Sequence, residues 1–204
     1  FDLGWSSYQL GSGRGFSFIS DEPLLMTYAT SGSDLLTAHE IVNDWEESSL
    51  ADIIFGWGGE RYSRRIARAI VERRSSTPIS TARQLADIIY MAVPRQYAHG
   101  RIHPATKTFQ ALRIAVNDEM GALKEGVNAA WHMLNHGGRI AVISFHSIED
   151  AIVKRQLLAW EKDGSGVRVT RKPLVASDEE IARNPRARSA KLRVIEKPKN
   201  TDTI

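Results

Sequence analysis

The sequence predicts an α/β protein in which a doubly wound sheet is interrupted by a block of helices. Residues 106–135 carry apolar side chains at steps of three and four, as an amphipathic helix does. Residues 139–145 are rich in β-branched side chains, which is typical of a buried parallel strand. Between residues 21 and 105, helical patterns separated by prolines divide this unit from a strand-like segment at the start of the chain.

Composition fits a globular protein and excludes several classes. The 204 residues are 42% hydrophobic and 25% charged, which suffices for a full core. No stretch approaches the roughly 18 apolar residues of a membrane helix. The chain has no cysteine, which excludes a disulfide scaffold, a zinc ribbon, an iron–sulfur protein and a thiol enzyme, and suits a cytosolic protein.

The first element is the end of a strand. The chain opens with Phe1-Asp2-Leu3-Gly4 and has no initiator methionine. An apolar residue followed directly by Asp-Leu-Gly is typical of the end of a buried strand, where a domain rarely begins. We therefore expect the first half of the fold to be missing.

Four helices are expected in the block that follows. The third shows one apolar face, formed by Tyr62, Ile66 and Ile70. The four predicted helices span residues 33–45, 51–55, 62–74 and 81–93.

The second half predicts a helix, a strand and another helix. The helix over 106–135 ends before Gly137-Gly138, as a helix stop should. After the strand, Ser147-Ile148-Glu149-Asp150 has the form of a capping box, with Ser147 as the capping residue of a helix from Ile148 to about Trp160. This order is that of a βα unit in a doubly wound sheet.

The tail predicts two strands, over residues 167–170 and 191–196, that form an antiparallel pair at the edge of the sheet. A polar loop separates them. If any segment of the chain is disordered, we expect it to be 161–190.

Charge is distributed unevenly, although the net charge is only +3. Residues 61–74 and 183–199 are strongly basic, whereas residues 34–52 are acidic and contain no lysine or arginine. One such run alone usually marks a solvated helix face. Two basic runs in one chain favour a polyanionic partner.

Two predicted strand ends carry groups that could do chemistry. Open α/β sheets bind ligands at the carboxyl ends of their strands. Asp2, Ser6 and Ser7 follow the first strand, and His146 and Ser147 follow the second. Each residue taken alone fits a turn or a helix cap equally well, and only their pairing at two strand ends favours a functional site.

Several familiar motifs fail. No G-x-G-x-x-G occurs, and Gly121–Gly126 has P-loop spacing without the Lys-Ser/Thr that should follow. The pairs His99/His103 and His132/His136 lack a third ligand, so neither predicts a metal site. No Gly-x-Ser-x-Gly elbow is present, which argues against a serine hydrolase.

The start of the helix at 106 is a candidate phosphate contact. Pro104 sets its beginning, and Thr106 or Thr108 could cap it. Lys107 and Arg113 add positive charge near the first turns, where free backbone amides already favour anions. A plain N-cap on a structural helix explains the same residues.

Six segments together resemble the RsmH (MraW) methyltransferase family. The first runs Asp2-Leu3-Gly4-x-Ser6-Ser7-x-Gln9-Leu10, and the others are residues 14–18, 60–62 with 66–70, 103–114, 144–150 with 153–154, and 184–189. Any one segment alone would be a weak signal. Taken in the family's order over nearly the whole chain, they are specific.

The resemblance implies a Rossmann-like S-adenosylmethionine-dependent methyltransferase that lacks its first strands and carries an inserted all-helical domain. The methyltransferase domain would comprise residues 1–20 and 106–204, and the insertion residues 21–105. The implied reaction is methylation of the N4 amine of a cytidine in small-subunit (16S) ribosomal RNA. The implied setting is cytoplasmic, on an assembled or late-assembling small subunit, without a metal or a membrane, and the enzyme could be a homodimer.

The resemblance also implies site residues. Asp2 and Gln9 would bind the cofactor, and Asp2 and Ser6 would accept the N–H group of the target amine and orient its lone pair toward the methyl group. The target base would be flipped or already unstacked. The RNA itself would contact seven side chains: Arg14, Arg61, Arg65, His103, Lys107, Arg113 and His146.

The chain departs from the family pattern at Trp5, Tyr8, Leu25 and Thr27. The last two lie in a loop where the family tends to carry an Asp and an Arg. Two alternatives therefore stand beside the enzyme: a non-catalytic RNA-binding module derived from it, and a methyltransferase that acts on another nucleic acid.

Overall fold

The computed structural model describes residues 1–4, 8, 11–29 and 35–199, and it divides into two compact units. One unit comprises Phe1–Gly4 with Met120–Ile204, and the other Trp5–Glu119. We call them the α/β unit and the helical unit and describe each by itself. The predicted methyltransferase domain (1–20 and 106–204) and the predicted insertion (21–105) have other boundaries than these two units. That domain division stays a prediction.

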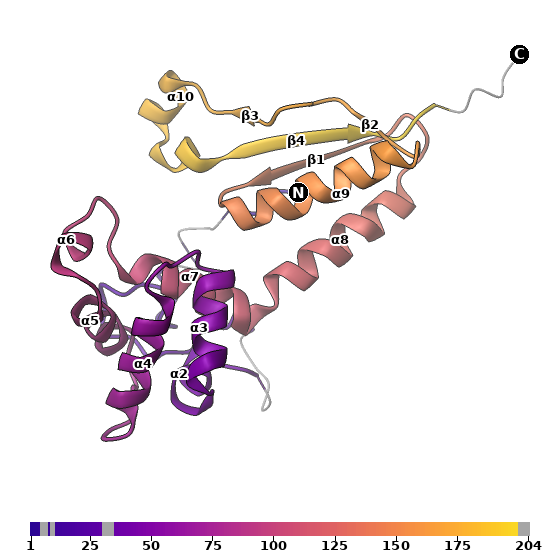
Figure 1. Cartoon of the computed structure of the whole chain (residues 1–204). Helices are drawn as coiled ribbons and strands as arrows, with labels where there is room; N and C mark the ends of the chain where they lie inside the picture. The colour runs from indigo at the N-terminus through magenta and orange to yellow at the C-terminus, as the bar shows by residue number, and fades with distance from the viewer. Residues whose placement is uncertain (5–7, 9–10, 30–34, 200–204) are drawn as a thin grey trace, which may run out of the picture. The chain divides into compact units, whose positions relative to one another are not determined.

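The helical unit is built from six helices within its described part (Figure 1). Helix α3 packs against α4, α4 against α5, and α7 against α2, α3 and α5. Fully buried side chains such as Ile54, Ile66 and Leu85 form its core. The helices are α2 (Ala38–Asp44), α3 (Glu47–Gly56), α4 (Ser63–Arg74), α5 (Ala82–Ala92), α6 (Arg95–Ala98) and α7 (Ala105–Asn117).

Two of these helices begin at capping boxes. Thr37 accepts a hydrogen bond from the backbone of Glu40 and returns one through its own backbone N–H, and Thr81 and Gln84 do the same for α5. The predicted third and fourth helices agree with α4 and α5 to within about one residue at each end. Helix α3 is longer than predicted, because its first turn is polar and carries no apolar period.

The predicted helix over 106–135 is two helices. Helix α7 ends at Asn117, Asp118 takes the left-handed conformation with φ 42° and ψ 44°, and α8 runs from Glu119 to Met133. The apolar period continues across the break because each helix buries its own face, Phe109 and Leu112 in the helical unit and Leu123 in the α/β unit. Periodicity alone does not distinguish this pair from one helix.

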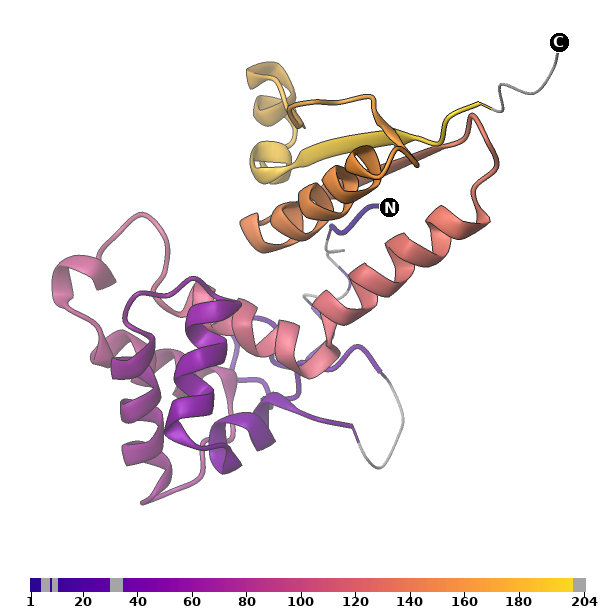
Figure 2. The same ribbon diagram turned by 45° about the vertical axis from the view of Figure 1, so that its right-hand side comes forward.

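The α/β unit contains α8, β1 (Arg139–Ser144), α9 (Ser147–Lys162) and β4 (Lys191–Glu196) as its main elements (Figure 2). Strand β4 pairs antiparallel with β1, with Ile140 opposite Ile195. On its other side β4 pairs with β2 (Val167–Arg168) and β3 (Leu174–Val175), also antiparallel. In both views α9 lies along β1 and β4.

Helices α8 and α9 pack through a tryptophan stack. The rings of Trp131 and Trp160 lie 4.3 Å apart at 13°. Gly166 sits where a side chain would collide with Ile195, 2.7 Å from an added Cβ, and approach Trp131 at 3.0 Å. A larger residue at Gly166 would have to displace the buried Ile195 side chain, so glycine favours the close return of the chain to the sheet.

The sheet confirms part of the expected architecture and corrects part. Strand β1 is buried on one face only, since Ile140, Val142 and Ser144 are buried whereas Arg139 and Ala141 are exposed. It has a parallel neighbour in Phe1–Leu3, through the bridge between Asp2 and Ile143. Its other neighbour, β4, is antiparallel, so the described sheet is mainly antiparallel rather than doubly wound and parallel. The antiparallel tail pair is confirmed, but β4 lies between other strands and not at the edge.

The expectation of disorder over 161–190 is wrong. This segment carries β2, β3, α10 (Asp178–Arg183) and the 3₁₀ helix η1 (Pro185–Ser189). Its order comes from pairing with β4 and from Arg168, whose side chain bonds Glu161 at 2.7 Å. Within the described residues, none of the helices is both long and apolar enough to cross a membrane.

Candidate functional site

The two predicted strand ends lie side by side in the α/β unit. The Phe1 carbonyl accepts a hydrogen bond from the Ile143 N–H at 2.9 Å, and the Leu3 N–H donates to the Ile143 carbonyl at 3.0 Å. These bonds place Asp2 beside Ile143, near the end of β1 and two residues before Phe145. The two strand ends are therefore neighbours, as far as Asp2 and the end of β1 show, whereas Ser6 and Ser7 lie outside the described residues.

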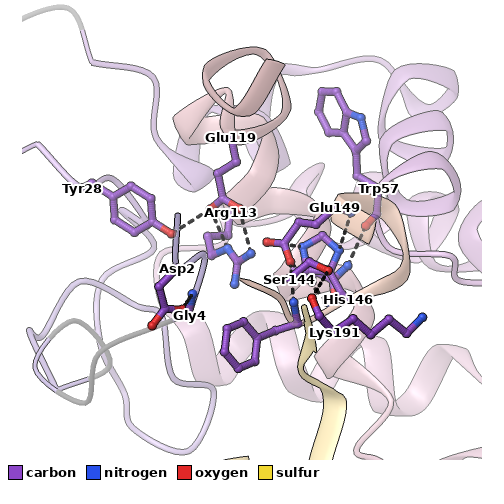
Figure 3. A network of polar contacts seen from close by, with 12 residues as sticks. Asp2, Gly4, Tyr28, Trp57, Arg113, Glu119, Ser144, His146, Glu149 and Lys191 are labelled. Carbon is purple, nitrogen blue, oxygen red and sulfur yellow. Dashed lines mark hydrogen bonds and ion pairs between the residues drawn. The ribbon is translucent and has the colours of Figure 1, made fainter. Parts of the chain in front are cut away.

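Asp2 is exposed and shaped by a tight turn. Its Oδ1 accepts the Gly4 N–H at 2.8 Å (Figure 3). A Cβ at Gly4 would lie 2.8 Å from the Phe145 ring and 2.9 Å from Asp2 Oδ1, so any other residue there would displace one of these side chains. Among the described residues the second oxygen, Oδ2, accepts no hydrogen bond. The arrangement leaves one carboxylate oxygen of Asp2 able to accept an N–H or O–H group from a ligand.

His146 is the N-cap of α9, where Ser147 was expected. The His146 Nδ1 accepts the Glu149 N–H at 3.4 Å, and Glu149 Oε2 accepts the backbone N–H groups of His146 at 3.2 Å and Phe145 at 2.8 Å. Ser147 is the first helical residue instead. The predicted box, with Ser147 as the cap and Asp150 as its acid, is therefore displaced by one residue at both positions, because the His146 imidazole accepts the helix N–H that was expected to bond a hydroxyl.

The other ring nitrogen of His146 faces the same carboxylate. Its Nε2 lies 3.0 Å from Glu149 Oε1, which is ion-pair distance, although the angle is not that of a hydrogen bond. Burial would raise the pKa of Glu149, but the adjacent His146 ring and the backbone N–H groups of Phe145 and His146 outweigh it and lower the pKa below its usual value. His146 therefore caps α9 through Nδ1 and lies against Glu149 with Nε2, so it serves the local structure first.

A second buried acid on α9 anchors β4. Asp150 receives hydrogen bonds from Arg193 at 2.7 and 3.1 Å and from Lys191 at 3.3 Å. Burial would raise the pKa of Asp150, but these cations lower it overall. The cluster holds the helix that follows the candidate site against the sheet.

In the helical unit, Arg113 and Arg14 are held by internal partners. Arg113 forms a two-point ion pair with Glu119, at 2.6 and 2.8 Å, and Tyr28 donates its hydroxyl to Glu119 at 2.7 Å (Figure 3). Arg14 donates to the carbonyls of Thr27 and Tyr28 at 3.0 Å. Both were predicted as RNA contacts, and each organises the loop that also carries the departure at Thr27.

Asn117 fixes the same loop to the end of α7. Its side chain donates to the Met26 carbonyl at 2.7 Å and accepts the Tyr28 N–H at 2.8 Å. Met26 itself adopts a φ of 55°, which a non-glycine residue seldom takes. The departures at Leu25 and Thr27 thus lie in a segment whose backbone is tightly held.

His103 lies against aromatic rings near the start of α7. It stacks on Phe18 at 4.5 Å and on Tyr90 at 6.3 Å. Its Nδ1 accepts the Ala105 N–H at 3.2 Å, so it provides the helix start with the bond that was expected from Thr106 or Thr108. Burial lowers the pKa of His103 despite the nearby Asp87, so its contact with a ligand would be made by a neutral ring.

The turn between α3 and α4 is built around a buried glutamate. The fully buried Glu60 accepts hydrogen bonds from the Tyr62 N–H at 2.9 Å and from the Tyr97 hydroxyl at 2.5 Å. Burial and the bond to Glu60 raise the pKa of Tyr97 to about 12. Lys107 donates to the Gly59 carbonyl at 3.2 Å, which ties α7 to this turn.

The predicted site residues divide between the units. Asp2 and His146 lie close together in the α/β unit, and Arg14, Arg61, Arg65, His103, Lys107 and Arg113 belong to the helical unit. Ser6 and Gln9 lie outside the described residues. Sequence reasoning missed Glu60 and Tyr97. The only local signal was a lone acid after Gly58-Gly59, just before a basic helix.

Comparisons with known proteins agree on one family. A model described as the MraW methylase family matches residues 1–198. The protein named ribosomal RNA small subunit methyltransferase H from Deinococcus deserti is 54% identical over 197 residues, which cover 96% of this chain and 63% of that protein. Proteins of the same name from Deinococcus radiodurans and Synechocystis sp. are 54% and 53% identical, and 61% and 62% of their lengths are covered. The chain thus spans about three fifths of these relatives.

Proposed function

Because the chain belongs to the MraW methylase family, we propose that the protein containing it methylates the N4 amine of a cytidine in small-subunit ribosomal RNA. The observation that carries this proposal is a sequence identity of 54%, over 96% of the chain, with relatives named as small-subunit ribosomal RNA methyltransferases. The position of Asp2 at a strand end supports it. The proposed fold is Rossmann-like, with residues 21–105 inserted.

The proposed cofactor is S-adenosylmethionine, which supplies the methyl group as a sulfonium when bound. Asp2 fits such a site because an exposed carboxylate oxygen at a strand end can accept hydrogen bonds from a polar ligand. Gln9 is proposed as a second cofactor contact from the family pattern alone.

In the proposed reaction the chain prepares the amine. The lone pair of an exocyclic cytosine amine is delocalised into the ring, which makes the amine a poor nucleophile. A carboxylate that accepts one N–H hydrogen bond, at Asp2, localises the lone pair and orients it toward the methyl donor. Ser6 is proposed to share this role.

The RNA is proposed to contact the exposed cations of the helical unit. Arg61 and Arg65 are exposed and bond no acid among the described residues. Arg14, Arg113 and His146 already have internal partners, so we assign them the positioning of loops and helix ends rather than phosphate contacts. The proposed partner is an assembling small subunit in the cytoplasm, and a homodimer remains part of the proposal.

The test is methylation of small ribosomal subunits by the protein that contains this chain. Subunits lacking the modification are incubated with methyl-labelled S-adenosylmethionine, and the RNA nucleosides are separated by mass spectrometry. We expect label in N4-methylcytidine and a loss of about 100-fold or more in Asp2→Asn, since removal of one transition-state contact costs that much. Met133→Ala, which changes an exposed side chain of the α/β unit, is the control and should keep the wild-type activity.

Three results would contradict the proposal. Label in another nucleoside would point to a different target. Label on DNA alone would favour the alternative nucleic acid. Retained RNA binding with no transfer to any form of the subunit would favour a non-catalytic RNA-binding module.

A further inference from the structure

A groove of about 440 Å³ lies between α3 and α4 in the helical unit. The two helices run side by side in both views (Figures 1 and 2). The groove is lined by Asp52, Phe55, Arg61, Tyr62, Arg64 and Arg65. Its volume falls within the range of about 300–1,000 Å³ that is usual for sites of small organic ligands.

The groove has a net positive lining. Three arginines face one aspartate, and among the described residues Arg61, Arg64 and Arg65 form no ion pair or hydrogen bond through their guanidinium groups. On the same helix Arg68 pairs with Glu47 at 3.7 Å. Three unpaired guanidinium groups at one groove indicate an anionic ligand.

Arg61 is held in place by aromatic rings instead of an acid. Its guanidinium carbon lies 4.8 Å from the centre of the Tyr62 ring and 4.9 Å from that of Tyr97. The buried Glu60 fixes Tyr97 through its hydroxyl. The five N–H donors of Arg61 are thus oriented and remain available to a ligand.

Phe55 supplies an apolar face in the same groove. Its side chain is 64% exposed at the end of α3, and among the described residues it stacks on no other ring. A single exposed apolar residue needs no explanation by itself. A free aromatic face next to free arginines is the combination that binds an unpaired nucleotide, because bases stack on aromatic rings and phosphates bind arginine.

We propose that this groove binds one unpaired nucleotide of an RNA strand, with the base on Phe55 and the adjoining phosphates on Arg61, Arg64 and Arg65. The identification of the polyanion as RNA rests on the proposed function. The groove is a holding site in the helical unit and takes no part in methyl transfer. Glu60 and Tyr97 act as positioning residues, since they reach the RNA only through Arg61.

The experiment measures binding of a fluorescein-labelled single-stranded RNA octamer by anisotropy at several salt concentrations, with an RNA duplex of equal length beside it. For Phe55→Ala we expect a loss of affinity for the single strand of about 5- to 150-fold, which is the range for one lost base stack. The slope of log K against log[salt] stays unchanged, because no phosphate contact is lost. Duplex binding changes by less than twofold.

Arg61→Gln gives the complementary result. Affinity falls for both RNAs, and the salt slope for the single strand becomes shallower by about 0.7, the value for one lost phosphate contact. Tyr97→Phe removes the hydroxyl bond that fixes the ring under Arg61 but keeps the charge of the arginine. The RNA affinity should therefore fall while the salt slope is kept. Met133→Ala serves as the matched control, since this side chain is 84% exposed in the α/β unit and should bind as the wild type does.

Unchanged single-strand affinity in Phe55→Ala, with a melting temperature equal to that of the wild type, overturns the proposal. So does an equal loss for duplex and single strand, which would indicate a purely electrostatic surface. A failure of the proposed function is distinguishable, because a protein that methylates no RNA could still show the Phe55-dependent preference for single strands.

Discussion

The buried cluster of Asp150, Arg193 and Lys191 yields a sharp stability prediction, because its two cations differ in exposure. The side chains of Asp150 and Arg193 are 11% and 7% exposed, and their bonds join α9 to β4. Lys191 bonds the same carboxylate but is 39% exposed. Removing the acid leaves a buried guanidinium without a counter-charge, whereas removing Arg193 leaves the acid with a cation.

Asp150→Ala should lower the free energy of unfolding of the α/β unit by about 3–5 kcal/mol, the cost of breaking a buried ion pair from one side. In Arg193→Met the bond from Lys191 persists. A hydrogen bond to a charged group contributes about 1.5–3 kcal/mol, so we expect a loss of only about 2 kcal/mol. Lys191→Met breaks a half-exposed pair and should cost less than about 1 kcal/mol.

Urea unfolding measures these differences, and the stacked rings of Trp131 and Trp160 report on the α/β unit through their circular dichroism. With a slope of about 1.5 kcal/mol per molar urea, Asp150→Ala should lower the midpoint by about 2–3 M. The reasoning is refuted if Arg193→Met costs as much as Asp150→Ala, or if Asp150→Ala costs less than about 1 kcal/mol.

Three further outcomes are expected. The lowered pKa of Glu149 means that its charge stabilises the fold above pH 4.5 and that this contribution is lost as the pH falls. Below pH 4.5 the melting temperature should therefore drop less steeply in Glu149→Gln than in the wild type. Parallel curves of melting temperature against pH would contradict this. Tyr97→Phe leaves the buried Glu60 short of one donor and should cost about 1–3 kcal/mol in thermal unfolding of the helical unit, whereas a neutral result would mean that water replaces the hydroxyl. Asn117→Ala removes the bonds to Met26 and Tyr28 and should cost about 2 kcal/mol and speed hydrogen exchange at the Tyr28 amide, and unchanged exchange would refute its anchoring role.

Local sequence patterns predicted most of the helices. The limits of α4 and α5 follow from apolar periodicity and, for α5, from the capping box at Thr81, all of which are set by residues within one or two turns. The break at Asp118 escaped the pattern because the two halves bury their apolar faces in different units. The order of 161–190 escaped it because short strands such as Leu174–Val175 are held by pairing with β4.

The placement of one strand end agrees with the sequence, and the roles of the site residues stay predictions. The position of Asp2 beside the end of β1 was expected from the strand ends, and the parallel bridge to Ile143 bears it out. The assignment of Arg113 as an RNA contact did not foresee its ion pair with Glu119, six residues away across the left-handed turn at Asp118. A side chain's charge can be read from a sequence, but its nearest partner depends on the path of the backbone.

The sequence by itself determined the family, through segments in a set order, and it determined the two basic runs and most of the helices. These properties are carried by residue identity and local spacing. Only the tertiary structure decided which arginines are engaged internally and which are free. It also brought Glu60 to Tyr97, 37 residues away, and so placed Arg61 over two aromatic rings. Contacts of this kind depend on how α3, α4 and α6 are arranged in space, which local spacing does not encode.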